Sequence, residues 1–206
     1  MKEPPFSTKQ SLVLGWEMLL AHYTVFVPIM FLSVAISFVN EYLSKRGFDP
    51  WTISAVVLGV IAQFILGMGI TKIALKITAG EPVAFDAAFS AMHLFFTYIG
   101  ASFLYGLIVL GGLFLFIVPG FLWLVSYWFF PYVLIDKELG AWAALSEAKR
   151  ISGGVRWELF KFMAVVGVLN LAGALAFFVG LFFTIPITAV AAAHVYRILQ
   201  KRLEPE

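Results

Sequence analysis

The sequence contains no cysteine and is poor in charged residues. Without thiols the chain forms no disulfide, offers no thiolate to an iron–sulfur cluster and has no cysteine nucleophile. Charged residues make up 13% of its 206 residues and hydrophobic residues 62%, whereas a typical soluble domain has about 25% charged residues. The composition therefore predicts that most side chains face hydrocarbon rather than water.

Four long stretches lack Asp, Glu, Lys and Arg, and they divide the chain into predicted membrane spans. These stretches are 18–40, 50–71, 87–135 and 162–196. One helical crossing of a bilayer needs about 20 mostly apolar residues, so the third stretch is long enough for two crossings. The sequence therefore predicts an all-α integral membrane protein with a single transmembrane domain, 1–206. We place its six transmembrane helices at 21–39, 51–73, 95–118, 119–135, 157–179 and 181–199.

The last two predicted spans share one uncharged stretch, 162–196, which is short for two helices. They cross the bilayer fully only if Trp157, Lys161 and Arg197 lie at the membrane interface and extend their polar ends toward the headgroups. A re-entrant hairpin in this region is the alternative.

Proline and glycine residues predict where the helices break. Gly80 is expected to cap the second span, because glycine accepts the left-handed conformation at a helix end. Segment 118–120 (Val-Pro-Gly) is expected to turn between the third and fourth spans, and segment 184–186 to begin the sixth. Pro28 and Pro131 lie within predicted spans and should kink them.

The basic residues predict the orientation of the chain in the membrane. Six spans place both termini on one side, and twelve of the fourteen Lys and Arg residues then fall on that side, with Lys45 and Arg46 opposite. Because cytoplasmic loops carry the excess of Lys and Arg, we expect an inner-membrane protein with both termini in the cytoplasm. The first twenty residues show no signal-peptide cleavage site, so the first span is expected to stay as an anchor.

Three segments of similar pattern precede the three predicted helix hairpins. They are 7–20, 85–96 and 139–151, and each is expected to form a short cytoplasmic interfacial helix. Each carries a small residue followed by an apolar one at a corresponding position, namely Ser11-Leu12, Ala88-Phe89 and Ala144-Leu145. The pattern predicts a tandem quasi-threefold helix-hairpin repeat with units of about 7–78, 85–136 and 139–200, all in one orientation.

The middle segment, 85–96, has the clearest amphipathic pattern. At about 100° per residue, one helix face collects its apolar side chains, which are Phe85, Ala88, Phe89, Met92 and Phe96. We expect this face to lie in the acyl region of the membrane interface. The alternative is that the segment forms only the first turns of the following span.

An ordered series of motifs runs through the chain. It comprises 118–120 (Val-Pro-Gly), 130–136 (Phe-Pro-Tyr-Val-Leu-Ile-Asp), 144–148 (Ala-Leu-Ser-Glu-Ala), 156–160 (Arg-Trp-Glu-Leu-Phe) and Ile185-Pro186. In this order the chain resembles a broad group of poorly characterised prokaryotic six-span membrane proteins, which includes the membrane domain attached to some glycerophosphodiester phosphodiesterases. The resemblance implies a fold and a lipid-rich setting. It carries over no active site, because these are packing and turn motifs and the phosphodiesterase domain is not found in the sequence.

Two amide side chains, Gln63 and Asn170, stand within the predicted spans beside small residues. The favoured interpretation is helix packing, in which small residues let two helices approach and the amide bonds across the contact. The alternative is that both amides line a central cavity. A polar path for a neutral solute would then also use Ser126 and Tyr127.

Histidines and basic residues are the remaining candidates for binding. His22, His93 and His194 are expected near the cytoplasmic interface, but no acidic residue or second histidine stands three or four positions after any of them. We therefore expect no metal site and no cofactor. Four basic residues are expected to contact anionic lipid headgroups, each adding about 1 kcal/mol of attraction. They are Lys149, Arg150, Arg156 and Lys161.

The sequence has no Gly-rich phosphate loop, HExxH motif or GxSxG motif. The favoured hypothesis is a non-enzymatic polytopic membrane protein that binds or organises lipid, or passes an apolar or lipid-like substrate. Its expected partners are membrane lipids and no nucleic acid, while a homo-oligomer or a membrane-protein partner is left open. A small transporter or channel for a neutral solute, and an intramembrane enzyme using interfacial His and Glu residues, are the alternatives.

Overall fold

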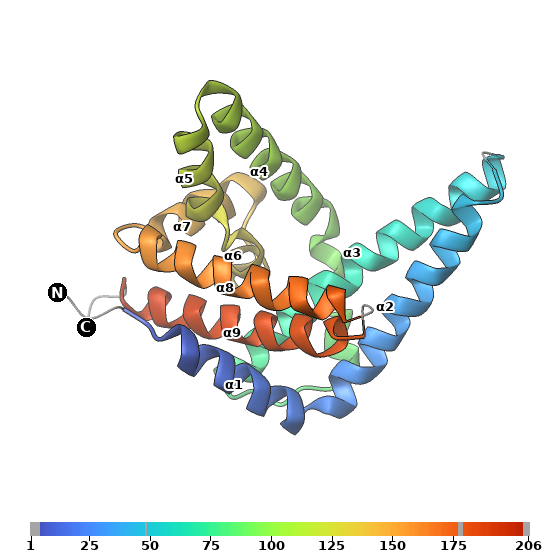
Figure 1. Ribbon diagram of the computed structural model, residues 1–206, viewed down its shortest axis with the longest axis horizontal. Coiled ribbons are helices and arrows are strands. Elements are labelled where there is room, and N and C mark those ends of the chain that lie inside the picture. Colours follow the sequence, from blue (N-terminus) through green and yellow to red (C-terminus); the bar gives the residue numbers. More distant parts are fainter. Residues whose placement is uncertain (1–4, 48, 177–178, 204–206) are drawn as a thin grey trace.

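A computed structural model describes residues 5–47, 49–176 and 179–203 (Figure 1). Over these ranges the chain forms α-helices, two short 3-10 turns and connecting loops, with no β-strand. The elements in chain order are α1 (Thr8–Ala21), α2 (Tyr23–Ser44), α3 (Pro50–Ala79), η1 (Phe85–Ala88), η2 (Met92–Leu94), α4 (Phe95–Leu115), α5 (Ile117–Tyr127), α6 (Phe130–Lys137), α7 (Ala141–Ile151), α8 (Arg156–Leu175) and α9 (Leu181–Lys201).

Six segments of the described chain are long and apolar enough to cross a membrane, as the sequence predicts. They are Tyr23–Ser44, Pro50–Ala79, Phe85–Leu115, Val118–Lys137, Arg156–Leu175 and Leu181–Lys201. The third takes in η1, η2 and α4, and the fourth takes in α5 and α6. The chain thus has the architecture of a multi-pass membrane protein.

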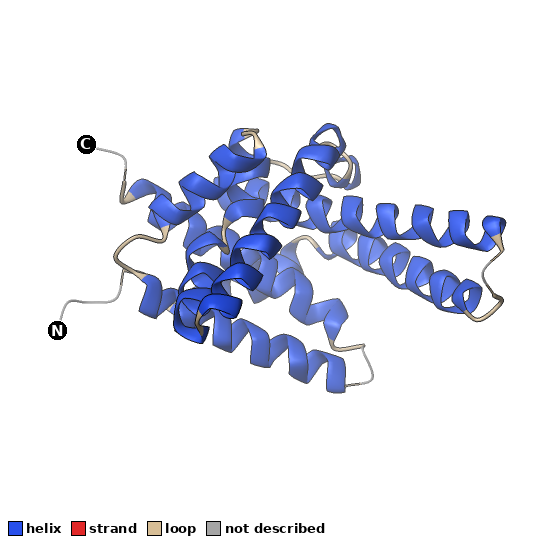
Figure 2. Cartoon of the chain, turned by 90° about the horizontal axis from the view of Figure 1, so that it is seen from above, coloured by secondary structure: helices blue, strands red, loops and turns tan. Residues whose placement is uncertain are grey.

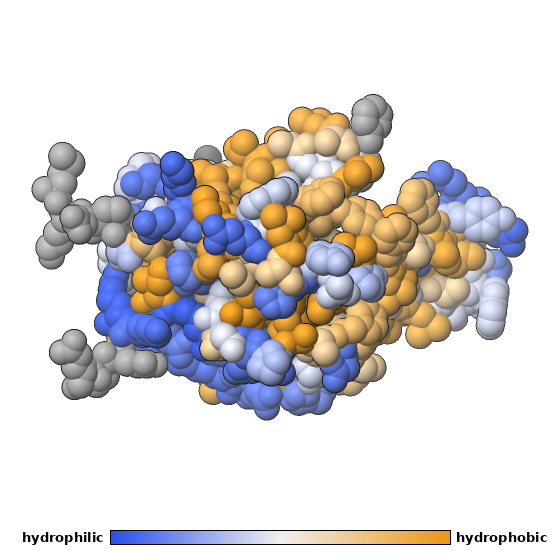
Figure 3. All heavy atoms as spheres, turned by 90° about the horizontal axis from the view of Figure 1, so that it is seen from below, coloured by the Kyte–Doolittle hydropathy of each residue, from blue (hydrophilic) through white to orange (hydrophobic). Residues whose placement is uncertain are grey.

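The surface is apolar over most of its middle. Phe96 and Phe114 are 84% and 92% exposed, which is unfavourable in water but suits a hydrocarbon solvent. Figure 3 shows polar residues gathered where α1 begins and α9 ends and again at the tip of the α2–α3 hairpin, with a largely apolar surface between them that also carries some polar residues. This distribution is the one that a membrane-embedded belt requires.

Three helix hairpins, α2–α3, α4–α5 and α8–α9, extend in different directions from a common centre (Figures 1 and 2). At that centre α3 contacts α6 and α9, and α7 also contacts α6 and α9. Each contributes a fully or almost fully buried side chain, namely Leu75, Leu134, Leu145 and Tyr196. The core therefore lies where the hairpins meet, and the hairpins themselves are largely surface.

Helix α1 packs along α9, and the sequence did not predict this contact. Ser11, Gly15 and Leu19 form its buried face. A Cβ atom at Gly15 would collide with the carbonyl oxygen of Ile187, so only glycine allows the two backbones this close. The segment 7–20 is helical as expected, but its partner is a helix of the core. The expected interfacial position of this segment stays a prediction.

The segment 85–96 does not form the regular interfacial helix that its pattern predicts. It forms the two 3-10 turns η1 and η2, because its small residues Ala87, Ala88 and Ala91 are buried and η1 contacts α3. The backbone of Ala88 lies directly against Gly69 of α3. Most of the apolar side chains assigned to the lipid face are exposed, namely Phe85, Phe89, Met92 and Phe96, whereas Ala88 is buried.

The third segment, 139–151, is helical from Ala141 to Ile151. Its buried face consists of Ala144, Leu145, Ala148 and Ile151, and Trp142 is exposed. The three segments thus have different structures and different packing partners. The quasi-threefold repeat stays a prediction.

The turn between the third and fourth spans comes earlier than the sequence predicts. The chain is extended at Phe116, and Pro119 lies in the first turn of α5, where a missing N–H group costs no hydrogen bond. Gly112 and Gly120 lie in contact where α4 and α5 meet. This contact leaves no room for a side chain at either position.

Pro131 lies in the first turn of α6 and does not kink a continuous helix. The predicted span 119–135 is divided into α5 and α6, since proline lacks the N–H group that would bond to the carbonyl of Tyr127. Pro28 lies inside α2. Pro186, expected near the start of the sixth span, lies inside α9, which begins at Leu181. Gly80 caps α3 in the left-handed conformation, with φ of 75°, as expected.

Candidate functional site

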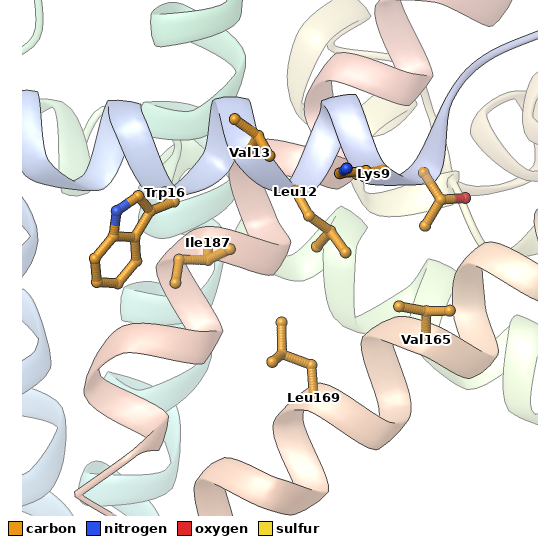
Figure 4. A pocket seen from close by; sticks show the side chains of 8 residues that line it. Lys9, Leu12, Val13, Trp16, Val165, Leu169 and Ile187 are labelled. Carbon is orange, nitrogen blue, oxygen red and sulfur yellow. The ribbon is translucent and has the colours of Figure 1, made fainter.

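An open groove lies between α1, α8 and α9 and has a volume of about 570 Å³ (Figure 4). We call it the α1–α8–α9 groove. It is lined by Thr8, Lys9, Leu12, Val13, Trp16, Val165, Leu169 and Ile187. The volume falls in the range of roughly 300–1,000 Å³ that is usual for ligand sites. Lys9 is the one charged residue among those that line it.

Helical spacing explains why α1 offers both a packing face and a groove face. Lys9, Val13 and Trp16 follow one another at intervals of four and three residues, so they share one side of the helix. The buried residues Ser11 and Gly15 lie on another side, against α9. The groove is therefore the space beside the α1–α9 contact.

A hydrogen bond fixes α1 on α9 close to the Lys9 end of the groove. Ser11 Oγ lies 3.1 Å from His194 Nδ1 and donates to the carbonyl of Ser7 at 3.0 Å. Because a serine hydroxyl has one hydrogen, this geometry requires the Nδ1–H group of His194 to donate to Ser11 Oγ. Ser7 also caps α1, accepting from the backbone N–H of Gln10 at 3.3 Å. These hydrogen bonds hold α1, which forms one wall of the groove, in place on α9.

A second groove, of about 380 Å³, lies between α5 and α8, and we call it the α5–α8 groove. It is lined by Val118, Phe121, Leu122, Val125, Arg156, Trp157 and Phe160. Phe121 and Phe160 meet edge to face across the two helices, with ring centroids 4.8 Å apart. Arg156 is the one charged residue among those that line it. Both grooves therefore combine apolar walls, one cation and one tryptophan.

A polar network joins the core helices α3, α6 and α9, and sequence reasoning missed it. Asp136 and Arg197 form an ion pair with 2.9 Å between Oδ1 and Nη2, and the Tyr196 hydroxyl donates to Asp136 Oδ2 at 2.9 Å. Lys72 Nζ donates to the carbonyl of Ile135 at 3.3 Å, which adds α3 to the network. The available signal was positional, because Asp136 and Arg197 are the first charges after the uncharged stretches 87–135 and 162–196.

Glu147 of α7 is the centre of a second ionic cluster. It accepts from Lys137 Nζ at 2.8 Å, and from Arg150 Nε and Nη2 at 2.7 Å each. The hydrogen bond from Arg150, followed by that from Lys137, lowers the pKa of Glu147 to about 2, against the opposing effect of its burial. Arg150 was expected to contact lipid, but its guanidinium is already engaged by this carboxylate.

Gln63 joins two helices and lines neither groove. Its Oε1 accepts from Ser33 Oγ at 2.7 Å, and its Nε2 donates to the Ser33 carbonyl at 2.6 Å and to Ser37 Oγ at 2.8 Å. Asn170 bonds across α8 and α9, since its Nδ2 donates to Thr188 Oγ1 at 3.3 Å. Both amides thus lie at helix contacts.

The other two polar candidates also lie apart from the grooves. Ser126 Oγ donates to the carbonyl of Leu122 at 2.6 Å, within its own helix. Tyr127 lies at the end of α5, with Lys149 Nζ 5.9 Å from its ring centroid. The structure therefore does not bring these two residues, Gln63 and Asn170 together along one path.

The three histidines lie in separate places. His22 joins α1 to α2, and its Nδ1 lies 3.1 Å from the carbonyl of Met18. His93 Nε2 lies 3.5 Å from Glu138 Oε2, while His194 contacts Ser11. Within the described ranges no three His, Asp or Glu side chains are grouped as metal ligands would be.

The basic residues expected at the headgroups differ in their contacts. Lys161 Nζ is 3.8 Å from Glu158 and 5.9 Å from the ring centroid of Trp157. Arg156 lines the α5–α8 groove. Of the four residues, Arg156 is the one that lines either of the two grooves.

Comparison of the chain with protein-family models, curated proteins and solved structures gives no match in any of the three. Any function of the grooves and polar networks therefore has to be inferred from their geometry.

Proposed function

We propose that this chain is a non-enzymatic, multi-pass membrane protein that binds lipid in the α1–α8–α9 groove. The observation that carries the proposal is an open groove with apolar walls and a single charged lining residue, Lys9. A groove of this kind suits a ligand with a long apolar part and a small polar or anionic part. A membrane phospholipid has this chemistry and is present wherever the chain is embedded.

The walls indicate how such a ligand would lie. Leu12, Leu169 and Ile187 come from three different helices and present aliphatic surface to one acyl chain (Figure 4). Burying that chain against protein exchanges one apolar environment for another, so specificity has to come from shape and from the polar end. Lys9 supplies a cation there, and Trp16 supplies a ring of the kind enriched at membrane interfaces.

The topology that we propose has both termini in the cytoplasm of an inner membrane. Twelve of the fourteen Lys and Arg residues then face the cytoplasm, in accordance with the positive-inside rule. The resemblance to the six-span group that includes the membrane domain of some glycerophosphodiester phosphodiesterases is part of this proposal. It agrees with a lipid-rich setting and adds no catalytic residue.

Filling the groove tests the proposal. In Val165→Trp an indole replaces a side chain that lines the groove and is 43% exposed. Val168→Trp is the matched control, because Val168 is on the same helix, is 67% exposed and is not a lining residue. Native mass spectrometry of the purified full chain with added phosphatidylglycerol measures the lipid bound.

We expect Val165→Trp to retain fewer lipids per chain than the unmodified protein, and Val168→Trp to retain the same number. Equal retention by all three proteins contradicts the proposed site. An unmodified chain that holds no phosphatidylglycerol contradicts the proposed function itself.

A further inference from the structure

We propose that the α5–α8 groove is a second lipid site, at which Arg156 selects the phosphate group of an anionic phospholipid. This inference rests on the proposed lipid-binding function and assigns it a second place and a ligand chemistry. The occupant is one phospholipid, with its phosphate on the guanidinium of Arg156 and an acyl chain along α5.

The position of Arg156 places a cation at the edge of an apolar groove. Arg156 is the first residue of α8, it is exposed, and it lines the groove beside Trp157. Among the residues that the structure describes, no carboxylate lies within 4 Å of its guanidinium. Its donors are therefore directed to no anion of the described chain, in contrast to those of Arg150, which engage Glu147.

The neighbouring charges leave this cation uncompensated. Glu158 is the one acidic residue in the first turn of α8, and its carboxylate faces Lys161 at 3.8 Å. Trp157 is 64% exposed and its ring lies tilted against that of Phe160, with ring centroids 5.4 Å apart. An exposed tryptophan next to a cation is the arrangement that favours the headgroup level of a membrane.

The rest of the groove fits hydrocarbon and no polar solute. Phe121 and Phe160 close one part of it with their edge-to-face contact, and Leu122 adds an aliphatic side chain that is 43% exposed. Free phosphate would use Arg156 alone and gain nothing from these walls. A phospholipid uses both the cation and the walls, so the charge and the surface together favour the lipid.

Arginine and lysine differ in how they hold phosphate, and this difference separates the two grooves. The planar guanidinium donates two parallel hydrogen bonds to one phosphate group, whereas an ammonium acts as a point charge. The α5–α8 groove with Arg156 should therefore discriminate for phosphate more strongly than the α1–α8–α9 groove with Lys9.

The test compares Arg156→Gln, Arg156→Lys and Lys201→Gln with the unmodified full chain in detergent. Lys201→Gln is the matched control, because it removes one positive charge from an exposed residue that lines neither groove. The probes are phosphatidylglycerol, diacylglycerol with the same acyl chains, and inorganic phosphate as a competitor. Native mass spectrometry reports the affinity for each lipid, and thermal unfolding confirms that each variant is folded.

We expect Arg156→Gln to bind phosphatidylglycerol about five-fold more weakly, the size of effect that one lost charge contact at a membrane surface produces. Arg156→Lys should lie between Arg156→Gln and the unmodified chain. Lys201→Gln should match the unmodified chain, binding of diacylglycerol should be the same in all four proteins, and inorganic phosphate should not compete.

Unchanged affinity of Arg156→Gln for phosphatidylglycerol overturns the inference. So does an equal loss in Lys201→Gln, which indicates general surface charge, and so does effective competition by inorganic phosphate, which indicates a free-anion site. Each of these results leaves lipid binding in the α1–α8–α9 groove intact. An unmodified chain that binds neither lipid overturns both proposals.

Discussion

Asp136 and Arg197 form an ion pair that joins the end of α6 to α9, with 2.9 Å between Oδ1 and Nη2. Their side chains are 15% and 26% exposed, so water screens the pair only in part. The Tyr196 hydroxyl, 2.9 Å from Asp136, adds a hydrogen bond from a fully buried residue. The pair therefore holds α9, one wall of the α1–α8–α9 groove, against the core.

Breaking this pair should destabilise the fold. Arg197→Gln leaves the Asp136 carboxylate without its cation, and Asp136→Asn leaves Arg197 and the Tyr196 hydroxyl with a weaker acceptor. We expect each variant to lose about 1–3 kcal/mol of unfolding free energy. In the double variant neither charge is left alone, so its loss should be smaller than the two single losses combined. Unfolding of the purified protein in detergent measures all three values. Strictly additive losses contradict a direct interaction.

Glu147 gives a prediction about pH. Its pKa in the folded protein is about 2, below the ordinary value of about 4.3, so folding favours its charged form. The stability that it contributes is present above about pH 4.3 and is lost as the pH falls toward 2. Glu147→Gln should therefore be less stable at pH 7 by about 1–3 kcal/mol, and the difference from the unmodified chain should shrink in acid.

A matched control for this prediction is Glu158→Gln. Its carboxylate has one partner, at 3.8 Å, so the substitution should change stability at pH 7 much less than Glu147→Gln does. Unfolding curves between pH 3 and pH 7 compare the three proteins. If the difference in unfolding free energy between Glu147→Gln and the unmodified chain is the same at every pH in this range, the ionic role of Glu147 is contradicted.

The close approach of α1 and α9 predicts opposite results for two glycines. Gly15→Ala places a methyl group against the carbonyl of Ile187, which should force the helices apart and cost about 1–3 kcal/mol. Gly167 lies on α8, and a methyl group added there has no neighbouring atom within 4 Å. Gly167→Ala should therefore leave the stability unchanged, or raise it by up to about 1 kcal/mol. Thermal unfolding distinguishes the two. A neutral Gly15→Ala means that the helices are not in contact at this point.

Gln63 separates helix packing from solute conduction. Gln63→Leu removes three hydrogen bonds between α2 and α3, and it should lower stability by about 0.6–2 kcal/mol. Since Gln63 lines neither groove, the substitution should leave lipid binding unchanged. Unfolding and native mass spectrometry of one preparation measure both quantities. A loss of lipid without a loss of stability contradicts the packing role.

The sequence predicts those parts of the fold that depend on the length of an uncharged stretch or on the type of a single residue. Each candidate span follows from a long uncharged stretch, and the cap at Gly80 follows from its residue type. The partners of these helices depend on distant residues. Asp136 meets Arg197, and Ser11 meets His194, because of how the core packs. The position of Asp136 and Arg197 after uncharged stretches marks each residue as unusual, but it does not show that the two residues form a pair.

The same distinction explains the errors. The segment 85–96 has the periodicity of an amphipathic helix, but it forms two 3-10 turns. Its alanines are buried, and the backbone of Ala88 lies against Gly69 of α3. The candidate site was equally hard to foresee. Lys9, Val165 and Ile187 come from three separate helices, and only their tertiary arrangement makes a groove.

In the proposed topology the chain crosses a membrane six times and both termini lie in the cytoplasm. The absence of native cysteine makes single-cysteine labelling with a membrane-impermeant maleimide the most direct test. Cysteine placed at Arg46, Phe116 or Val179, in the three hairpin loops, should react in intact cells. Cysteine placed at Glu81 or Lys201 should react only after the membrane is permeabilised. Reaction at Lys201 in intact cells, or protection at Val179, would contradict the account.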